Sequence, residues 1–338
     1  MNSSLVSKVS VCIPVYNGSD YIAESIESIL AQTYKDFHII VCDNCSTDNT
    51  EEIVRSFKDP RITYICNAKN LGLVGNANRC LELADGKYIN ILHHDDIMLP
   101  DNLELKVKML EDHPEVGIVH SNIKLIDSKG KIISNNIWNP ESRHDYIEKG
   151  LTAFFKYIDF LPNGASFFIG AVLFRRECYK TLGGFDSRLP HCNDSEMWMR
   201  MLLFYDVACI GKPLVNYRVH LSSTSTRWGD WNSLPYFNEH LLAFSMLLHK
   251  YNNRIPRPEV LRRRVNNNFS KRAIFLADFR FKHGDHKTAI EFLKQAMIIN
   301  PKVMVSKRFI KALGKVTLGE KGHRIYLSFK NKLFDDAN

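Results

Sequence analysis

Apolar segments alternate with amphipathic ones along the first third of the chain. Four short apolar runs, each ended by polar or turn residues, are typical of buried strands: Lys8–Pro14, Phe37–Cys42, Arg61–Cys66 and Lys87–Leu92. Apolar residues also recur at helix spacing over Asp20–Leu30, Asn49–Phe57, Gly75–Ala84 and Pro100–Leu110. This alternation predicts a doubly wound α/β fold, in which a mostly parallel sheet carries helices on both faces.

Strand patterns continue less regularly through the next part of the chain. Further strands are expected at Val116–His120, Ile123–Asp127 and Phe167–Phe174, and a short strand is expected to end at Tyr217–His220. A helix is expected from Asn193 to near Phe204, whereas Asn135–Pro162 shows no regular pattern and is expected to be irregular.

Strand signals stop after Trp231, and the remaining pattern is helical. Helices are expected at His240–Tyr251, Val260–Phe281 and His286–Ile299. We therefore predict an α/β domain at residues 1–226 and a basic helical region at residues 227–338. One helix pair is too few for a stacked repeat, so a helical cap on the first domain is favoured over a repeat. Contact with a partner or with a membrane stays open as well.

Polar side chains stand where three of the expected strands end. Asn17 follows the first strand, Asp43–Asn44 follows the second, and His93–Asp96 follows the fourth. The carboxyl ends of parallel strands meet at one edge of a sheet, where such sheets bind ligands. The Asp95–Asp96 pair suits a hard divalent cation such as Mg²⁺ or Mn²⁺. The alternative is a solvated turn that caps the helix opened by Pro100.

The sequence lacks the two common phosphate-binding loops. No G-x-G-x-x-G follows the first strand, which argues against a dinucleotide dehydrogenase, and no G-x-x-x-x-G-K-[ST] is present. Bound phosphates would therefore be neutralised by another group, and a cation held by Asp96 is the simplest candidate.

Composition places the chain among globular proteins with ample core material. Of its 338 residues, 45% are hydrophobic and 11% aromatic. Cys42 and Cys45 have the spacing of a redox motif, but a polar strand-end loop accounts for them better. No signal-peptide pattern opens the chain, and the longest apolar run, Phe167–Phe174, is far below the ~20 residues of a membrane-spanning helix. A cytoplasmic location is expected.

Charge is distributed unevenly. From Lys250 to the end the chain carries 21 Lys and Arg residues against 7 Asp and Glu, whereas the preceding part carries 24 against 30. A basic tail on a mildly acidic body could meet nucleic acid or an anionic membrane surface, or it could be a solvated helical face. The segment Val303–Phe334 mixes Lys and Arg with apolar residues, as interfacial helices do.

Seven stretches, in this order, resemble the bacterial-type family-2 glycosyltransferases of the GT-A fold. They are Ile13–Asn17, Asp43–Asp48, Asn70–Gly72, Asp95–Asp96, Gly183–Asp186, Asn193–Arg200 and Tyr217–His220. Seven matches in order are much more specific than any one of them. The resemblance covers Val9–Ser225 and leaves the helical tail unassigned.

The resemblance implies roles for individual residues. It places Asp96 as the last carboxylate of a DxD-type motif that holds Mn²⁺ or Mg²⁺, with His220 beside the metal or the diphosphate, and Asp194 as the general base. The residues that it implies for binding the nucleotide sugar are Pro14, Tyr16, Asn17, Asp43, Asn44, Asn70, Gly72, Asn78 and Asp95.

Three positions depart from the family pattern. Asn44-Cys45 stands where many members have aspartate and glycine, which leaves the choice of base open. His93 replaces a carboxylate, and His93 and His94 either tune the metal or pack beside it. Asn193 replaces a glutamate, so Asp194 lacks a like-charged neighbour that would help to raise its pKa.

The implied activity is an inverting transfer from a nucleotide-diphosphate sugar, with a UDP-sugar favoured. A cation stabilises the leaving diphosphate while Asp194 takes the proton of the attacking hydroxyl, so a single displacement inverts the anomeric centre. The expected acceptor is a glycan or a lipid-linked saccharide, as in cell-surface polysaccharide assembly. The protein is then expected in the cytoplasm, peripherally at the inner face of the membrane through its basic tail.

Other functions remain as alternatives. One is a nucleotide-sugar-binding scaffold without activity, which the departures at Asn44, His93 and Asn193 leave open. Another is a sugar nucleotidyltransferase, which would need a glycine-rich and basic loop where Val15–Asp20 has none. No nucleic-acid partner is expected, because the body is acidic and no basic-aromatic module is present.

Overall fold

The computed structural model describes residues 7–134, 144–160, 167–221, 223, 232–317 and 319. The chain divides into two compact units. The first comprises Met1–Tyr157 and Ala165–Gly229, and the second comprises Ile158–Gly164 and Asp230–Asn338. The expected boundary at residue 226 lies close to this division, but the short segment at residues 158–164 joins the second unit.

The first unit is built on the parallel strands that the sequence predicts. They are β1 (Val9–Val15), β2 (Phe37–Asp43), β3 (Ile62–Cys66) and β4 (Tyr88–Ile91), in the spatial order β3-β2-β1-β4. All neighbouring pairs among these four are parallel. Their carboxyl ends therefore lie at one edge, which sets the position of the candidate site.

The sheet continues beyond β4 with mixed directions. β9 (Val172–Arg175) lies antiparallel between β4 and β6 (Val116–Ile126), and β6 pairs in parallel with β10 (Asp206–Arg218). Three short strands pair antiparallel at its margins: β5 (Ile97–Met98), β7 (Ile132–Ser134) and β8 (Tyr146–Glu148).

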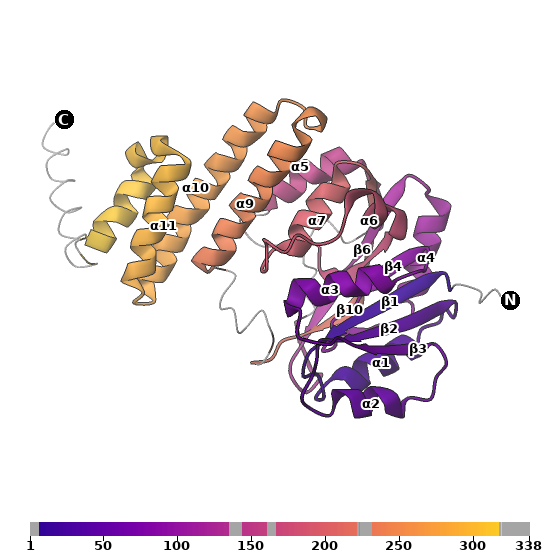
Figure 1. Cartoon of the computed structure of the whole chain (residues 1–338). Helices are drawn as coiled ribbons and strands as arrows, with labels where there is room; N and C mark the ends of the chain where they lie inside the picture. Colours follow the sequence, from indigo (N-terminus) through magenta and orange to yellow (C-terminus); the bar gives the residue numbers. More distant parts are fainter. Residues whose placement is uncertain are drawn as a thin grey trace, which may run out of the picture. The chain divides into compact units, whose positions relative to one another are not determined.

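Helices cover both faces of this sheet, as predicted. α3 (Gly72–Leu83) lies on one face, and α1 (Ile22–Leu30) and α2 (Thr50–Ser56) lie on the other (Figure 1). Residues at helix spacing anchor α1, since Ile22, Ile26 and Ile29 are fully buried. Among the described residues, the other helices of this unit are α4 (Asn102–Asp112), α6 (Arg176–Leu182) and α7 (Asn193–Leu202). α5 (Gly150–Phe160) belongs to this unit up to Tyr157.

Several strand predictions in the second half of the sheet were wrong in detail. The short strand expected to end at Tyr217–His220 is the 13-residue β10, which ends at Arg218. β6 runs unbroken where two strands were expected, because the polar interruption is satisfied: the Asn122 side chain donates to the Gly211 carbonyl at 2.7 Å. The expected strand Phe167–Phe174 begins only at Val172 and is preceded by the 3₁₀ turn η3 (Ile169–Ala171). The stretch expected to be irregular contains β8 and most of α5, and its residues 135–143 and 161–162 lie outside the described residues.

The second unit is helical, as expected. It contains α9 (Leu234–Tyr251), α10 (Pro258–Lys282) and α11 (His286–Ile299), with 3₁₀ turns at η4 (Asn252–Arg254) and η5 (Pro301–Val305). α9 begins earlier than predicted because Ser233 caps it, accepting from the Tyr236 amide at 3.4 Å. The apolar residues that α10 and α11 bury include Phe269, Ala273, Ala277, Phe292, Leu293 and Ala296.

The tail beyond η5 is described only in part. Residues 307–317 are helical, and most of the expected interfacial segment after them lies outside the described residues. None of the helices that the structure describes combines the length and apolarity needed to cross a membrane.

Candidate active site

The end of β2 is fixed by a buried carboxylate. Asp43 is 1% exposed, and each of its oxygens has a partner: Oδ1 accepts from the Ser46 amide at 2.8 Å and Oδ2 from the Tyr64 hydroxyl at 2.7 Å. Burial and the bond to Asp43 raise the pKa of the Tyr64 hydroxyl. Asp43 therefore shapes the loop that follows β2, and any contact to a nucleoside would use oxygen lone pairs that these bonds leave free.

Asn44 ties that loop to the turn before α3. Its Nδ2 donates to Asn70 Oδ1 at 2.9 Å and to the Gly72 carbonyl at 3.2 Å, and its Oδ1 accepts from the Leu71 amide at 2.8 Å. Gly72 has φ +74°, a conformation that favours glycine. The predicted residues Asn44, Asn70 and Gly72 thus lie together, although the Asn44 amide is engaged within the protein.

The end of β1 joins the same loop. The backbone amide of Asn44 donates to the Val15 carbonyl at 2.8 Å. Asn17 Oδ1 accepts from the backbone amide of Thr47 at 2.8 Å. Tyr16 is 45% exposed beside them, and the Pro14 backbone hydrogen-bonds the ring of His94. The polar strand ends predicted to converge do so.

The two carboxylates after β4 have different surroundings. Asp95 Oδ2 lies 2.9 Å from His220 Nε2. Asp96 is 1% exposed, and its Oδ1 accepts from the Arg218 amide at 3.0 Å. Its Oδ2 is buried with no hydrogen-bond partner among the described residues, and a Cβ added at Gly170 would lie 3.4 Å from it.

These surroundings shift the two pKa values in opposite directions. Burial, with the neighbouring Asp95 charge, raises the pKa of Asp96 well above its usual range. Burial acts the same way on Asp95, but the hydrogen bond from His220 and the nearby imidazoles outweigh it and lower the pKa of Asp95. In the structure the His220 ring contacts Asp95. Its expected place beside a metal on Asp96 or beside the diphosphate stays a prediction.

The donor set at this point fits a divalent cation. His93, Asp95 and Asp96 each offer one ligand atom, and these atoms lie within 4.8 Å of one another. The unsatisfied Asp96 Oδ2 is a buried oxygen that a cation would complete. Two carboxylates and one imidazole form a set that binds Mn²⁺ and, through oxygen, Mg²⁺.

Arg218 is a site residue that the sequence did not reveal. It is 2% exposed, its Nε donates to the Asp95 carbonyl at 2.8 Å, and its Nη2 binds the Glu24 carboxylate. Its Nη1 reaches the Ser128 carbonyl at 3.3 Å, and the guanidinium lies 4.7 Å from the centre of the Tyr21 ring. The motif at Tyr217–His220 was visible, but these partners are remote in sequence.

Asp194 stands in the first turn of α7, as predicted. Its Oδ1 accepts from the Ser195 amide at 2.7 Å. Burial raises the pKa of Asp194 to about 6, and the bonds from Ser195 oppose that shift only in part. Asn193 gives Asp194 no like-charged neighbour, so burial is what raises the pKa of Asp194. Within the described residues, no hydrogen bond or ion pair links Asp194 to Asp95 or Asp96.

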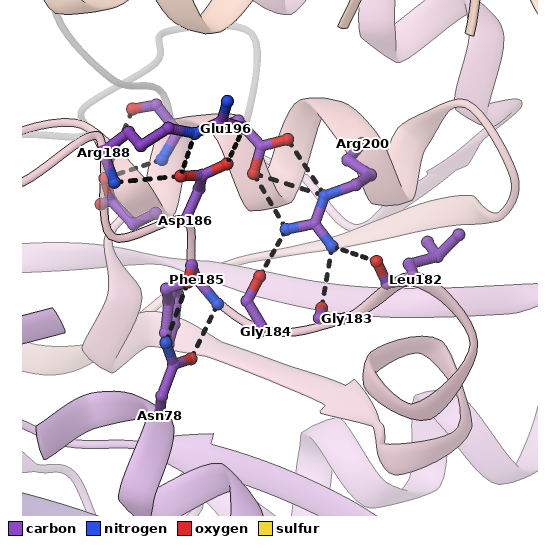
Figure 2. Close-up of polar contacts among 11 residues, drawn as sticks. Asn78, Leu182, Gly183, Gly184, Phe185, Asp186, Arg188, Glu196 and Arg200 are labelled. Carbon is purple, nitrogen blue, oxygen red and sulfur yellow. Dashed lines mark hydrogen bonds and ion pairs between the residues drawn. The ribbon is translucent and has the colours of Figure 1, made fainter. Parts of the chain in front are cut away.

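A network around the Gly183–Asp186 turn holds α7 in place (Figure 2). The Arg200 guanidinium donates to the carbonyls of Leu182, Gly183 and Gly184 at 2.7–2.8 Å and pairs with Glu196 at 2.9 Å. Gly183 has φ +92°, which strains any other residue type.

Asn78 of α3 fastens the same turn from the other side. Its Nδ2 donates to the Phe185 carbonyl and its Oδ1 accepts from the Phe185 amide, both at 2.9 Å (Figure 2). Both polar atoms of its side chain are therefore engaged within the protein. Its expected contact with a nucleotide sugar stays a prediction.

Two solved structures define the class of fold. S. aureus TarS 1-349 in complex with UDP-GlcNAc is similar with a TM-score of 0.62, at 16% identity, over 96% of this chain and 92% of that chain. The mannosyltransferase PcManGT from Pyrobaculum calidifontis, in complex with GDP-Man and Mn²⁺, is similar with a TM-score of 0.55, at 20% identity, over 93% and 88%. At these identities the likeness shows the fold, which is of the GT-A type with a helical C-terminal region.

Sequence similarity identifies the family to which the chain belongs. Residues 10–183 match the family described as Glycosyl transferase family 2, and the protein belongs to this family. An uncharacterised glycosyltransferase of Rickettsia prowazekii is 33% identical over 222 residues, which are 64% of this chain. The chain spans 65% of the length of that relative. The family resemblance drawn from the sequence is confirmed.

Proposed function

We propose that the protein transfers a sugar from a nucleotide-diphosphate donor to a hydroxyl of a saccharide acceptor, with inversion at the anomeric carbon. The observation that carries this proposal is the cluster of His93, Asp95 and Asp96, whose ligand atoms lie within 4.8 Å of one another. The cluster stands at the carboxyl ends of parallel strands in a sheet of the GT-A type, where α/β sheets bind their ligands.

The donor would lie along the edge formed by the ends of β1, β2 and β4. Pro14, Tyr16, Asn17 and Asp43 line its nucleoside side in this proposal, and Asp95 its sugar or ribose. Asn44, Asn70 and Gly72 hold the shape of that wall through their mutual hydrogen bonds. A UDP-sugar is favoured, since TarS was solved with UDP-GlcNAc, and GDP-Man in PcManGT makes the guanine nucleotide the main competitor.

Asp95, Asp96 and His93 would hold the divalent cation, Mn²⁺ or Mg²⁺, with His220 fixing the Asp95 carboxylate. When bound, such a cation neutralises the charge that grows on the diphosphate leaving group. Arg218 positions both carboxylates, because its side chain binds the Asp95 carbonyl and its amide binds Asp96.

Asp194 would take the proton of the acceptor hydroxyl. A pKa raised to about 6 leaves it ionised near neutral pH and still basic enough to accept that proton. The bond from the Ser195 amide fixes the orientation of the carboxylate, and the turn bound by Arg200 and Asn78 fixes its helix. A single carboxylate acting as base, with no second one needed as nucleophile, accounts for inversion.

Residues 1–226 form the donor-binding and catalytic part in this proposal, and residues 227–338 bring the enzyme to its acceptor. A glycan or lipid-linked saccharide fits this arrangement, as in cell-surface polysaccharide assembly. Exposed apolar and basic side chains alternate near the end of the described chain, which supports peripheral contact with an anionic membrane. The apolar members are Ile298, Met304, Val305, Ile310 and Leu313, and the basic ones Lys302, Lys307, Arg308 and Lys311.

The experiment that tests this function measures release of nucleoside diphosphate from a panel of UDP-, GDP- and dTDP-sugars, with and without added acceptor saccharides. We expect one donor to be turned over only with Mn²⁺ or Mg²⁺ and not after chelation. Asp95→Asn should abolish turnover, while Glu259→Gln, on the exposed first turn of α10, serves as the control. Turnover that persists in Asp95→Asn after chelation would contradict the proposal.

A further inference from the structure

His93 stands in the cation cluster where the family resemblance led us to expect a carboxylate. Its backbone is fixed, because its carbonyl accepts from the Asp96 amide at 3.1 Å and from the Ser25 hydroxyl at 3.5 Å. This turn brings its ring to the carboxylates of Asp95 and Asp96, with ligand atoms within 4.8 Å. An imidazole therefore faces the same point as two carboxylate oxygens.

The neighbouring histidines are committed elsewhere. The His94 ring hydrogen-bonds the Pro14 backbone and packs on Gly18, where an added Cβ would lie 2.7 Å from its Cδ2 atom. His220 binds Asp95 at 2.9 Å and contacts the Tyr21 ring, with centroids 4.8 Å apart. Of the three, His93 alone forms a three-residue ligand group with both carboxylates in the part of the chain that the structure describes.

A second observation points to a bound ion at this spot. Asp96 is 1% exposed, and its Oδ2 has no hydrogen-bond partner among the described residues. An isolated buried carboxylate oxygen is costly unless it is protonated or bound to a cation. The His93 nitrogen and the Asp95 carboxylate are the other ligand atoms within reach of it.

We propose that His93 is a nitrogen ligand of the cation and that it makes the site select Mn²⁺ over Mg²⁺. This inference rests on the proposed function. Mg²⁺ prefers an all-oxygen shell and keeps much of its water, whereas imidazole suits later divalent ions of the first transition row. Replacing an expected carboxylate by imidazole removes one negative charge and one oxygen ligand, and both changes weaken Mg²⁺ more than Mn²⁺.

The test is a titration of the purified full chain with Mn²⁺ in the presence of UDP, GDP or dTDP in turn. Free Mn²⁺ is measured by electron paramagnetic resonance, and Mg²⁺ is the competitor. The quantity compared is the ratio of the Mg²⁺ to the Mn²⁺ dissociation constant. His93→Asp restores the carboxylate and should lower this ratio about tenfold, whereas His93→Gln should weaken Mn²⁺ without strengthening Mg²⁺. His113→Gln, at a partly exposed histidine before β6, is the control and should leave the ratio unchanged.

The outcomes separate this inference from the function on which it rests. If the ratio is the same in the wild type and in His93→Asp while both bind UDP with the ion, the inference is wrong and the proposed function stands. If the wild type binds neither ion with any nucleotide, both are wrong. Pulsed spectra of the bound Mn²⁺ add a direct readout, since nitrogen coupling should weaken in His93→Asp and stay intact in His113→Gln.

Discussion

Asp194 and Lys106 show how burial sets the chemistry of single residues in this protein. Asp194 is held in the first turn of α7, and burial raises its pKa to about 6. Lys106 is fully buried in α4, where its ammonium donates to the Ala171 carbonyl at 2.6 Å, and burial lowers its pKa to about 7. Both shifts disfavour the charged form, and both have measurable consequences.

The pH profile of the transfer reaction should report Asp194. Only the ionised carboxylate accepts a proton, so kcat should rise about tenfold per pH unit below pH ~6 and level off above it. Asp194→Asn should lower kcat by about 10²–10⁴-fold while the affinity for the nucleotide stays that of the wild type. A rate independent of pH between 4.5 and 7, or an unchanged kcat in Asp194→Asn, would assign the base to another residue.

Lys106 should make the stability of the fold depend on pH above neutrality. Its pKa is about 7 when folded and 10.5 when exposed, so between these values the unfolded chain binds more protons and the free energy of unfolding rises with pH. Lys106→Met should reduce that slope by up to about 1.4 kcal/mol per pH unit in urea unfolding at pH 7.5 to 9.5. Lys108→Met, at an exposed position of the same helix, should leave the slope as it is. If the free energy of unfolding depends on pH equally in the wild type and in Lys106→Met, the account is wrong.

At the scale of elements, the turn at Gly183–Asp186 joins α3 to α7. Asn78 binds it from α3, and Arg200, which pairs with Glu196, binds it from α7. A Cβ added at Gly184 would lie 2.4 Å from Asn78 Oδ1, so the turn and the amide are tightly fitted. The helix that carries Asp194 is thereby fixed to α3, the helix that begins at Gly72.

Removing the Asn78 amide should loosen this connection. Asn78→Ala leaves the Phe185 amide and carbonyl without their partners, and we expect the free energy of unfolding to fall by about 2 kcal/mol. Arg79→Ala removes only an exposed ion pair with Glu82 on the same helix and should change stability by less than ~0.5 kcal/mol. Equal unfolding midpoints for the two variants would show that the turn does not depend on Asn78.

The elements that the sequence predicted are those with strong local patterns. The four parallel strands, the helices between them and the helix pair in the tail all carry apolar periodicity, and the structure has them. The start of β9 could not be predicted, because the Gly170 and Ala171 carbonyls are bound by side chains remote in sequence, Asn90 and Lys106. The same reason hid the roles of Arg218 and Asn78, whose partners come from distant segments.

At the scale of the whole molecule, charge is distributed unevenly along the chain. The basic segment Lys302–Lys311 lies beside exposed apolar residues, among them Ile298 at 73% and Val305 at 85% exposure. We expect the protein to sediment with vesicles that contain anionic lipid and to stay in solution with neutral ones. Such selectivity combines apolar contact with electrostatic attraction.

Variants of this segment should separate the two contributions. Lys307→Ser and Arg308→Ser should each weaken binding to anionic vesicles about fivefold, since a basic residue near such a surface contributes ~1 kcal/mol. Val305→Ser should weaken binding without changing its dependence on salt. Leu242→Ser, at an exposed apolar position of α9, is the matched control. Binding that is equal for neutral and anionic vesicles would contradict an electrostatic contact.

The central claim is that the edge of the sheet binds a nucleotide through a cation, and calorimetry tests it most directly. The wild-type protein is titrated with UDP, GDP and dTDP, each with and without Mn²⁺, alongside Asp95→Asn and Asp194→Asn. We predict that one nucleotide binds only with Mn²⁺, that Asp95→Asn abolishes this binding, and that Asp194→Asn retains it. Binding of no nucleotide under any condition, or equal binding by Asp95→Asn, would contradict the claim.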